Sequence, residues 1–195
     1  MKLKQVTLSL ALVLALTNCA GSYQAQNDAS QASANENVVA AAPSCPVVKF
    51  TPPAGLKALP NEPLPARAVG EPTKGGVCSG TVYLVEQPVT VYRVWSANSE
   101  KTLYGGWWSL NQPQGPKAAY REQNNICPSW SELDRMSACE VKVGTKITIG
   151  PGQSAFCPKA DMTYPPSPTL QVYIPNYYDG GQIYVENCTK GAVWP

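Results

Sequence analysis

The chain has 195 residues, of which 44% are hydrophobic and only 14% are charged, whereas charged residues make up about 25% of an average soluble domain. It contains 15 basic residues, 13 acidic residues and no histidine. Without histidine it cannot form a Ser-His-Asp or Cys-His catalytic group, a paired-histidine zinc site or a histidine pH switch. The length allows one domain of ordinary size, and any catalysis must use other side chains.

The first 18 residues are typical of a signal peptide. Lys2 and Lys4 precede an apolar run at residues 6–16, which is shorter than the roughly 20 residues of a membrane-spanning helix. The segment that ends at Cys19 reads Leu-Thr-Asn-Cys and resembles a bacterial lipoprotein processing site, with Cys19 as the lipidated residue. Cleavage after Ala20 would instead remove Cys19. We therefore expect an exported protein, either secreted or anchored by Cys19 to outer-leaflet or outer-membrane lipid of a bacterial cell envelope.

Three segments follow the predicted signal peptide. Residues 19–44 are mostly small and polar, which predicts a disordered tether. Residues 45–77 are rich in proline, which excludes a long helix or a central strand and favours an extended arm over the domain. Residues 78–195 are predicted to form the folded core. Removal of residues 1–18 leaves 13 basic and 13 acidic residues, so no basic tract remains that would bind nucleic acid.

The core is predicted to be an α+β, mainly β domain with two short helices and mostly antiparallel strands. Runs of β-branched and aromatic residues predict the strands, at residues 81–86, 89–95, 141–149, 170–174 and 182–186. A first helix is expected at residues 116–124, where helix-forming residues follow a proline. A second is expected at residues 129–137, which begin with a Ser-Trp-Ser-Glu capping-box pattern. Residues 150–152, Gly-Pro-Gly, are predicted to form a turn.

Six cysteines remain in the exported chain, an even number that predicts three disulfides in an oxidising compartment. They are Cys45, Cys78, Cys127, Cys139, Cys157 and Cys188. Their spacing includes no C-x-x-C pair and leaves the connectivity open. Because histidine is also absent, we expect neither a metal site nor a bound cofactor.

Two features of the core could bind a ligand. Arg93 lies within an otherwise apolar strand, where it is either a rim residue whose stem covers apolar surface or a ligand for phosphate or carboxylate. Trp107 and Trp108 follow two glycines. Strand alternation buries one of them and turns the other outward, where its ring can stack on a planar ligand.

The order of the motifs resembles a known family over residues 89–175. An arginine is followed by a glycine–aromatic–serine segment, a proline–glycine turn, a second arginine and finally a glutamine in a strand. The corresponding residues here are Tyr92, Arg93, Trp107, Trp108, Ser109, Arg121 and Gln171. This order is similar to that of secreted NAD glycohydrolases of the tuberculosis necrotizing toxin type, which are distant relatives of ADP-ribosyltransferases. The long glycine run before the glutamine and the Arg–Phe–Gly start of that family are altered in this sequence.

The resemblance implies an exported enzyme, a toxin or effector, that takes NAD as substrate and cleaves its nicotinamide–ribose bond. Arg93 and Gln171 are then the catalytic residues, while Tyr92, Trp107, Trp108, Ser109 and Arg121 bind the substrate. Nicotinamide leaves from a pyridinium that is already cationic, so the reaction needs no histidine to protonate the leaving group. The alternative is a non-catalytic, disulfide-stabilised surface lipoprotein that binds protein or carbohydrate through exposed tryptophans.

Overall fold

The computed structural model describes residues 44–177 and 181–195, which all belong to one compact unit. The predicted signal peptide, the Cys19 lipidation site and the tether up to residue 43 lie outside the described residues. Within the two described ranges, no helix has the length and apolar character needed to cross a membrane.

The first of two main sheets has five antiparallel strands in the order β1–β2–β6–β9–β4. Their bounds are Leu56–Leu59, Thr81–Val85, Lys146–Gly152, Ser167–Tyr173 and Trp107–Trp108. Strand β1 comes from the proline-rich segment and lies at the edge of the sheet, where the prolines beside it interrupt no ladder of hydrogen bonds.

The second sheet is built around β5 (Arg135–Val141). Strand β3 (Val89–Trp95) pairs with one edge of β5, and the short strands β10 (Val185–Glu186) and β11 (Ala192–Val193) also pair with it, all antiparallel. A separate ribbon joins β7 (Ala155–Cys157) to β8 (Met162–Tyr164). Among the described residues, the helical segments are the 3-10 helix η1 (Glu100–Tyr104) and the helix α1 (Lys117–Gln123).

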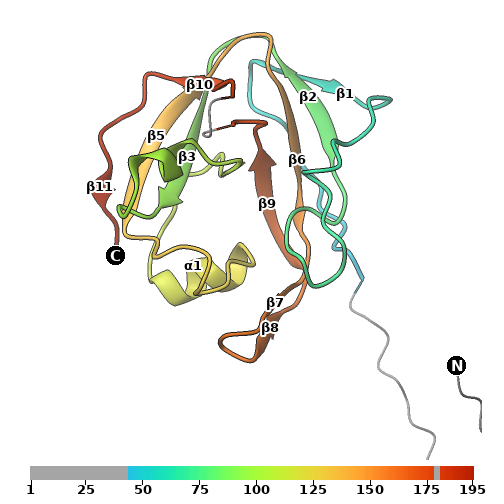
Figure 1. The fold of residues 1–195 in the computed structure, drawn as a ribbon. Coiled ribbons are helices and arrows are strands. Elements are labelled where there is room, and N and C mark those ends of the chain that lie inside the picture. Colours follow the sequence, from blue (N-terminus) through green and yellow to red (C-terminus); the bar gives the residue numbers. More distant parts are fainter. Residues whose placement is uncertain (1–43, 178–180) are drawn as a thin grey trace, which may run out of the picture. The chain divides into compact units, whose positions relative to one another are not determined.

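The two sheets enclose a common core, as Figure 1 shows for β3 and β5 on one side and β2, β6 and β9 on the other. The core combines buried side chains from both sheets, among them Val91 and Val141 of the second sheet and Ile147, Ile149 and Val172 of the first. Residues Tyr92 and Ser109 exchange two backbone hydrogen bonds of 2.8 Å, which link β3 to the residue that follows β4. Helix α1 lies at one end of the two sheets (Figure 1).

This architecture confirms the predicted mainly β domain with antiparallel strands. The predicted strands at residues 81–86 and 89–95 correspond to β2 and β3, and the helix predicted at 116–124 corresponds to α1. All six cysteines among the described residues are paired, as Cys45–Cys78, Cys127–Cys157 and Cys139–Cys188. The structure therefore supplies the connectivity that the spacing left open.

The second predicted helix, at residues 129–137, is wrong. One turn forms, with the Trp130 amide donating to the Cys127 carbonyl, and the chain then runs extended into β5. Leu133 has a φ of 53°, which no residue within an α-helix adopts. The Arg121 guanidinium also binds the carbonyls of residues 131 and 132. The capping-box pattern is local, and these long-range contacts override it.

The strand predicted at residues 141–149 is interrupted: Val141 ends β5, residues 142–145 form a turn, and residues 146–149 belong to β6. Gly144, with a φ of 85°, allows the reversal, and the Thr145 amide donates to the Lys142 carbonyl. The Gly-Pro-Gly turn predicted at 150–152 is also wrong, since these residues continue β6 with an irregularity between Pro151 and Gly152. Gly150 is required there because a Cβ would clash with the Ser79 carbonyl oxygen.

Candidate functional site

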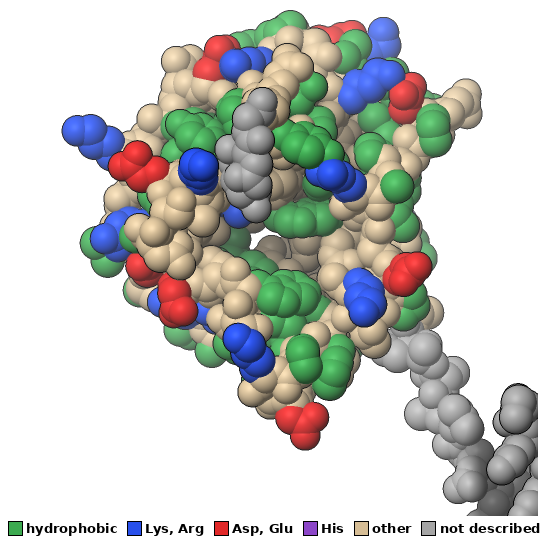
Figure 2. All heavy atoms as spheres, viewed as in Figure 1, with side chains coloured by type: hydrophobic (Ala, Val, Ile, Leu, Met, Phe, Trp, Pro, Cys, Tyr) green, Lys and Arg blue, Asp and Glu red, His purple; other side chains and the backbone are tan. Residues whose placement is uncertain are grey.

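A cavity of about 660 Å³ opens between the two sheets beside α1. This volume lies within the range of small-molecule sites. Its walls come from β3, β4, β9, the C-terminal end of α1, the loop of residues 66–76 and the loop of residues 130–133. Figure 2 shows the hollow, with hydrophobic side chains at its edge and Lys and Arg side chains around it.

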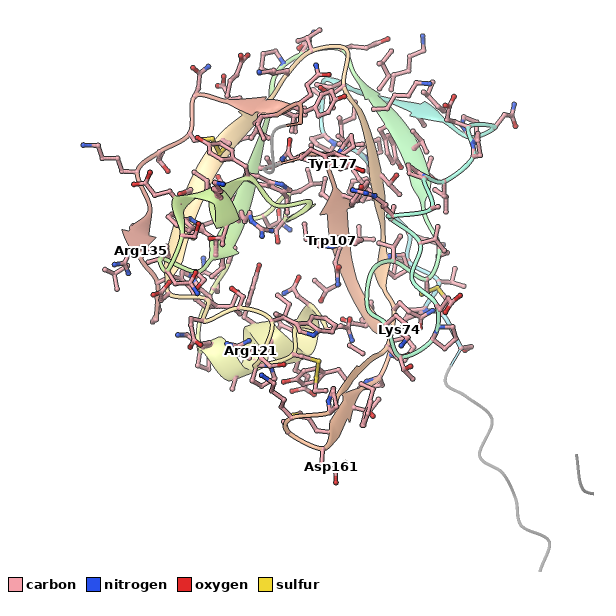
Figure 3. The ribbon with its side chains drawn as sticks, in the orientation of Figure 1. Lys74, Trp107, Arg121, Arg135, Asp161 and Tyr177 are labelled. Atoms are coloured by element: carbon pink, nitrogen blue, oxygen red, sulfur yellow. A yellow bond between two sulfur atoms is a disulfide. The ribbon has the colours of Figure 1, made fainter. Side chains whose placement is uncertain are left out.

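The structure brings five of the seven predicted site residues to this cavity. They are Arg93, Trp107, Trp108, Ser109 and Gln171. Trp108 is buried and Trp107 half-buried, as strand alternation predicted for adjacent tryptophans. Trp107 packs against Tyr173 with ring centroids 5.2 Å apart, and Figure 3 places Trp107 between the two sheets.

The half-buried Arg93 guanidinium holds the segment that carries the two tryptophans. Its Nε donates to the Thr102 carbonyl at 2.9 Å, and its Nη1 donates to the Trp107 carbonyl. The guanidinium also lies 5.9 Å from the Trp108 ring and packs on Gly105, where a Cβ would clash with Nη2. Because this arginine fixes the backbone of Trp107 and the ring of Trp108 together, it determines the geometry of one wall of the cavity.

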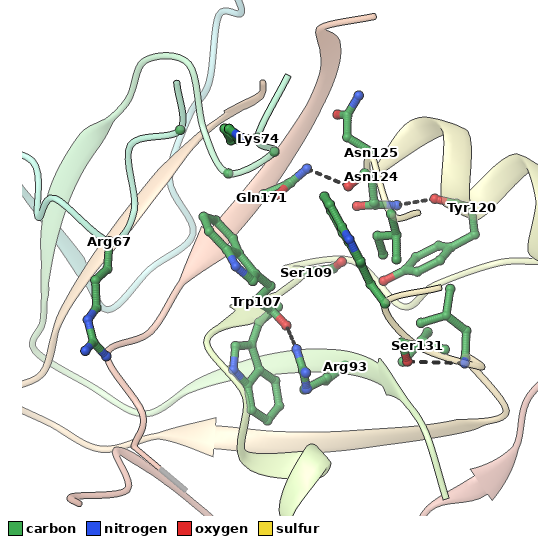
Figure 4. Close-up of a pocket in the computed structure, with 18 of the residues that line it drawn as sticks. Arg67, Lys74, Arg93, Trp107, Ser109, Tyr120, Asn124, Asn125, Ser131 and Gln171 are labelled. Atoms are coloured by element: carbon green, nitrogen blue, oxygen red, sulfur yellow. Dashed lines mark hydrogen bonds between the residues drawn. The ribbon is translucent and has the colours of Figure 1, made fainter. Parts of the chain in front are cut away.

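Gln171 lies on β9, the strand that pairs with β4, and its side-chain amide has a fixed orientation. The side chain is 6% exposed, and its Nε2 donates to the Asn124 carbonyl at 2.9 Å (Figure 4). The side-chain Nδ2 of Asn124 in turn donates to the Tyr120 carbonyl at 3.0 Å. With Nε2 committed to the end of α1, the Gln171 amide has its acceptor, Oε1, available for a ligand.

Asn125 follows Asn124, the C-cap of α1, and lies beside Gln171. It adopts a φ of 54°, is 1% exposed, and its Nδ2 donates to the Pro165 carbonyl at 2.6 Å. Its Oδ1 is buried and has no hydrogen-bond partner among the described residues. A Cβ on Gly152 would clash with this oxygen and lie 2.8 Å from Gln171 Nε2. Gly152 therefore lets the two amides pack closely at the floor of the cavity.

The proline-rich arm supplies charged residues that sequence reasoning missed. Arg67, Glu71 and Lys74 line the cavity, and neither cation forms an ion pair with any residue in the described ranges. Arg67 lies over the Tyr177 ring, 4.2 Å from its centroid. The described walls of the cavity thus carry three cations, Arg67, Lys74 and Arg93, and one carboxylate, Glu71. In the sequence, a lysine followed by two consecutive glycines, residues 74–76, was the feature that could have indicated a role for this loop.

Residues 152–156 hold this arm loop in place. The Thr73 amide donates to Ser154 Oγ at 2.9 Å, and the Gly75 amide donates to the Ser154 carbonyl at 2.8 Å. Gln153 Nε2 donates to the Gly70 carbonyl at 3.2 Å, and the Phe156 amide donates to the Thr73 carbonyl at 2.9 Å. The arm loop is therefore part of the folded domain and forms a fixed wall of the cavity.

Two predicted site residues do not line the cavity. Tyr92 contributes the backbone pairing with Ser109. Arg121, on α1 (Figure 3), is 8% exposed and donates to the carbonyls of Cys127, Ser131 and Glu132. The structure thus places Arg121 behind the wall, where it holds the loop that follows Cys127.

Burial favours the neutral form of two tyrosines, Tyr120 in the wall of the cavity and Tyr173 packed against Trp107. Burial raises the pKa of Tyr120 above its ordinary value of 10.0, while a hydrogen bond with Ser109 and the charge of Arg93 act in the opposite direction. Burial also raises the pKa of Tyr173, which the charge of Arg67 opposes. Figure 4 shows the Tyr120 hydroxyl directed toward Ser109. At neutral pH Tyr120 is a polar wall group and carries no charge.

Comparison with protein-family models, with curated proteins and with solved structures finds no match to this chain. Among the residues that the structure describes, no three Cys, Asp or Glu side chains gather as metal ligands would.

Proposed function

We propose that the cavity binds NAD and cleaves the bond between nicotinamide and ribose. One observation carries the proposal: Arg93, Trp107 and Gln171, which are far apart in the sequence, line the same cavity. These are residues that the resemblance to secreted NAD glycohydrolases assigns to one site, and their convergence on one cavity supports the proposal.

The charges of the cavity suit a dinucleotide. Arg67 and Lys74 are cations on one wall without an ion-pair partner in the described part of the chain, and they are placed to bind the diphosphate. Arg93 is engaged with the carbonyls of Thr102 and Trp107, so we assign it a positioning role for the aromatic wall. This revises the phosphate-binding role considered for Arg93 from the sequence.

The remaining groups suit departure of nicotinamide. Heterolysis of the bond between ribose C1′ and the pyridinium nitrogen leaves the electron pair on nitrogen, giving neutral nicotinamide and an oxocarbenium ion. Water adds at C1′ and loses a proton to solvent, giving ADP-ribose. Gln171 Oε1 accepts a hydrogen bond from a ribose hydroxyl or from this water, because Nε2 is engaged by Asn124. Holding the reactants in this orientation accelerates the reaction without an acid catalyst.

The chain is proposed to act outside the cell that makes it, as a toxin or effector. The three disulfides are compatible with an exported protein. Anchoring through lipidated Cys19 is part of the proposal, and the intact mass of membrane-extracted protein tests it. A diacylated or triacylated Cys19 at the amino terminus is expected, whereas a chain that starts at Gly21 would contradict it.

Nicotinamide release from NAD tests the proposed activity. We expect release by the oxidised wild-type protein, a loss of about a hundredfold or more in Gln171→Ala, and a similar loss in Arg93→Ala because the aromatic wall shifts. Gln182→Ala, outside the cavity, is the matched control and should keep wild-type activity. The proposal fails if high concentrations of folded wild-type protein release no nicotinamide.

A second candidate function is binding of protein or carbohydrate without catalysis. It is favoured by the exposure of Trp130, which is 51% exposed at the rim of the cavity, because exposed aromatic side chains are common in recognition sites. Ligand-dependent quenching of tryptophan fluorescence by NAD without turnover would indicate a binding protein for the dinucleotide. Quenching by an oligosaccharide but not by NAD would favour the surface-binding function.

A further inference from the structure

Trp130 is a large apolar side chain that the core leaves uncovered. It is 51% exposed, yet it lines the cavity. Its ring edge reaches the arm loop on the other side, since a Cβ built on Gly75 would lie 3.2 Å from Cη2 and 3.3 Å from Cζ3 of the indole. Gly75 has a φ of 74° and no side chain to displace the ring. The indole therefore extends across the opening from one wall to the other.

The loop that carries Trp130 is held at several points although its tryptophan is exposed. The Trp130 amide closes a turn onto the Cys127 carbonyl at 2.9 Å, and Cys127 is disulfide-bonded to Cys157. Behind the loop, the buried Arg121 guanidinium donates to three of its carbonyls, at 2.6 to 3.4 Å. A buried guanidinium whose hydrogen bonds go to backbone carbonyls stabilises the backbone conformation of the loop that supplies them.

We propose that Trp130 is the second aromatic wall of the site and stacks on a planar heteroaromatic ring of the bound ligand, with Arg121 as its positioning residue. The ring belongs to the dinucleotide, so the inference rests on the proposed function for the identity of the ligand. An aromatic ring fixed before binding loses little conformational entropy when the ligand arrives. Base–aromatic stacking of this kind strengthens binding about tenfold or more.

Isothermal titration of the full chain with three probes tests the stacking role. ADP-ribose carries adenine and diphosphate, nicotinamide carries the other ring alone, and inorganic pyrophosphate carries no ring. In Trp130→Ala we expect the Kd of at least one ring-bearing probe to rise about tenfold or more, with the Kd of pyrophosphate unchanged. Trp130→Phe keeps a ring and should stay within about threefold of wild type. The probe that loses affinity identifies the ring that Trp130 covers.

The control removes an exposed apolar side chain elsewhere. Val143 is 59% exposed in the turn between β5 and β6 and does not line the cavity, so Val143→Ala should bind all three probes as wild type does. The stacking role is contradicted by unchanged Kd values in Trp130→Ala, by equal weakening of all three probes, or by a wild-type protein that binds neither ring-bearing probe.

Arg121→Lys tests the positioning role, because lysine keeps the charge and loses the planar fork of donors. It should weaken the same ring-bearing probe as Trp130→Ala and leave pyrophosphate binding unchanged. In the Trp130→Ala background it should change the Kd by less than about twofold, since residues that act through one another are not additive. Additive losses would show that Arg121 acts independently of Trp130. If Arg121→Lys does not fold, the Trp130 variants still decide the stacking role.

The outcomes separate this inference from the proposed function. Nicotinamide release with unchanged ring binding in Trp130→Ala would support NAD cleavage and refute the second aromatic wall. Trp130-dependent binding of ADP-ribose by a wild-type protein that releases no nicotinamide would refute the cleavage and support the aromatic wall.

Discussion

Two buried amides meet at the floor of the cavity, and a missing side chain makes this possible. A Cβ built on Gly152 would clash with Asn125 Oδ1 and lie only 2.8 Å from Gln171 Nε2. Both amides are held by hydrogen bonds: Gln171 Nε2 donates to the Asn124 carbonyl, and Asn125 Nδ2 donates to the Pro165 carbonyl. Gly152 is thus a site residue without a side chain, and its sequence context, Gly-Pro-Gly, predicted only a turn.

Gly152→Ala is expected to lower nicotinamide release at least tenfold while NAD still enters the cavity. The added methyl group must displace Gln171 or Asn125, and small misplacements of a catalytic group strongly reduce rates. Steady-state kinetics would reveal the loss in kcat.

Gly144→Ala is the matched control, because it adds the same methyl group at a left-handed glycine with nothing within 4 Å. It should lose some stability from backbone strain and keep the wild-type kcat. Equal kcat values for Gly152→Ala and wild type would contradict the role of Gly152.

At the scale of elements, the sequence predicted strands correctly where a run of β-branched and aromatic side chains is enough to determine them. Strands β2 and β3 consist of β-branched and aromatic residues, and the structure has both. The segment from residue 129 to 137 carries an equally clear helix signal, yet it forms a turn and part of β5. Pairing with β3 and the Arg121 contacts decide its conformation, and no local pattern reports contacts of that range.

Tyr120 of helix α1 lines the cavity and is hydrogen-bonded to Ser109, the residue that follows β4. Its pKa is raised by burial, so the unfolded chain loses this proton at a lower pH than the folded protein does. The protonated phenol stabilises the fold fully below pH 10, and this contribution is lost as the pH rises above 10.

We therefore expect wild type to have a higher free energy of unfolding than Tyr120→Phe at pH 8. This difference should be smaller at pH 11. Denaturant unfolding at several pH values measures this difference. Tyr92→Phe, which removes a half-buried hydroxyl on the neighbouring β3, controls for the loss of a phenol. A difference between wild type and Tyr120→Phe that is constant with pH would contradict the account.

At the scale of the whole molecule, the cavity depends on segments that the disulfides tie together. Cys45–Cys78 closes the arm that carries Arg67 and Lys74, and Cys127–Cys157 fixes the loop that carries Trp130. The sequence predicted three disulfides and an arm over the domain. It did not predict that the arm forms a wall of the site, because this depends on the contacts of residues 152–156 with the loop of residues 70–76.

Replacement of both Cys45 and Cys78 by serine is expected to lower the free energy of unfolding by about 3–4 kcal/mol, from the closure entropy of a loop of this length. Because the arm is then less constrained, the Kd for pyrophosphate should also rise. Denaturant unfolding and calorimetric titration measure the two effects.

The matched variant replaces Cys139 and Cys188, which join β5 to the segment after β10, away from the arm. It should lose stability and keep the wild-type Kd for pyrophosphate. An arm variant with unchanged pyrophosphate affinity would show that the arm cations do not bind the diphosphate.

Identification of the bond that the protein breaks in NAD is the most direct test of the central claim. The products of NAD after incubation with the oxidised protein in ¹⁸O-labelled water can be identified by mass spectrometry. Our account predicts unlabelled nicotinamide and ADP-ribose that carries one ¹⁸O atom at C1′. Intact NAD after prolonged incubation, or cleavage at the diphosphate to AMP and nicotinamide mononucleotide, would contradict it.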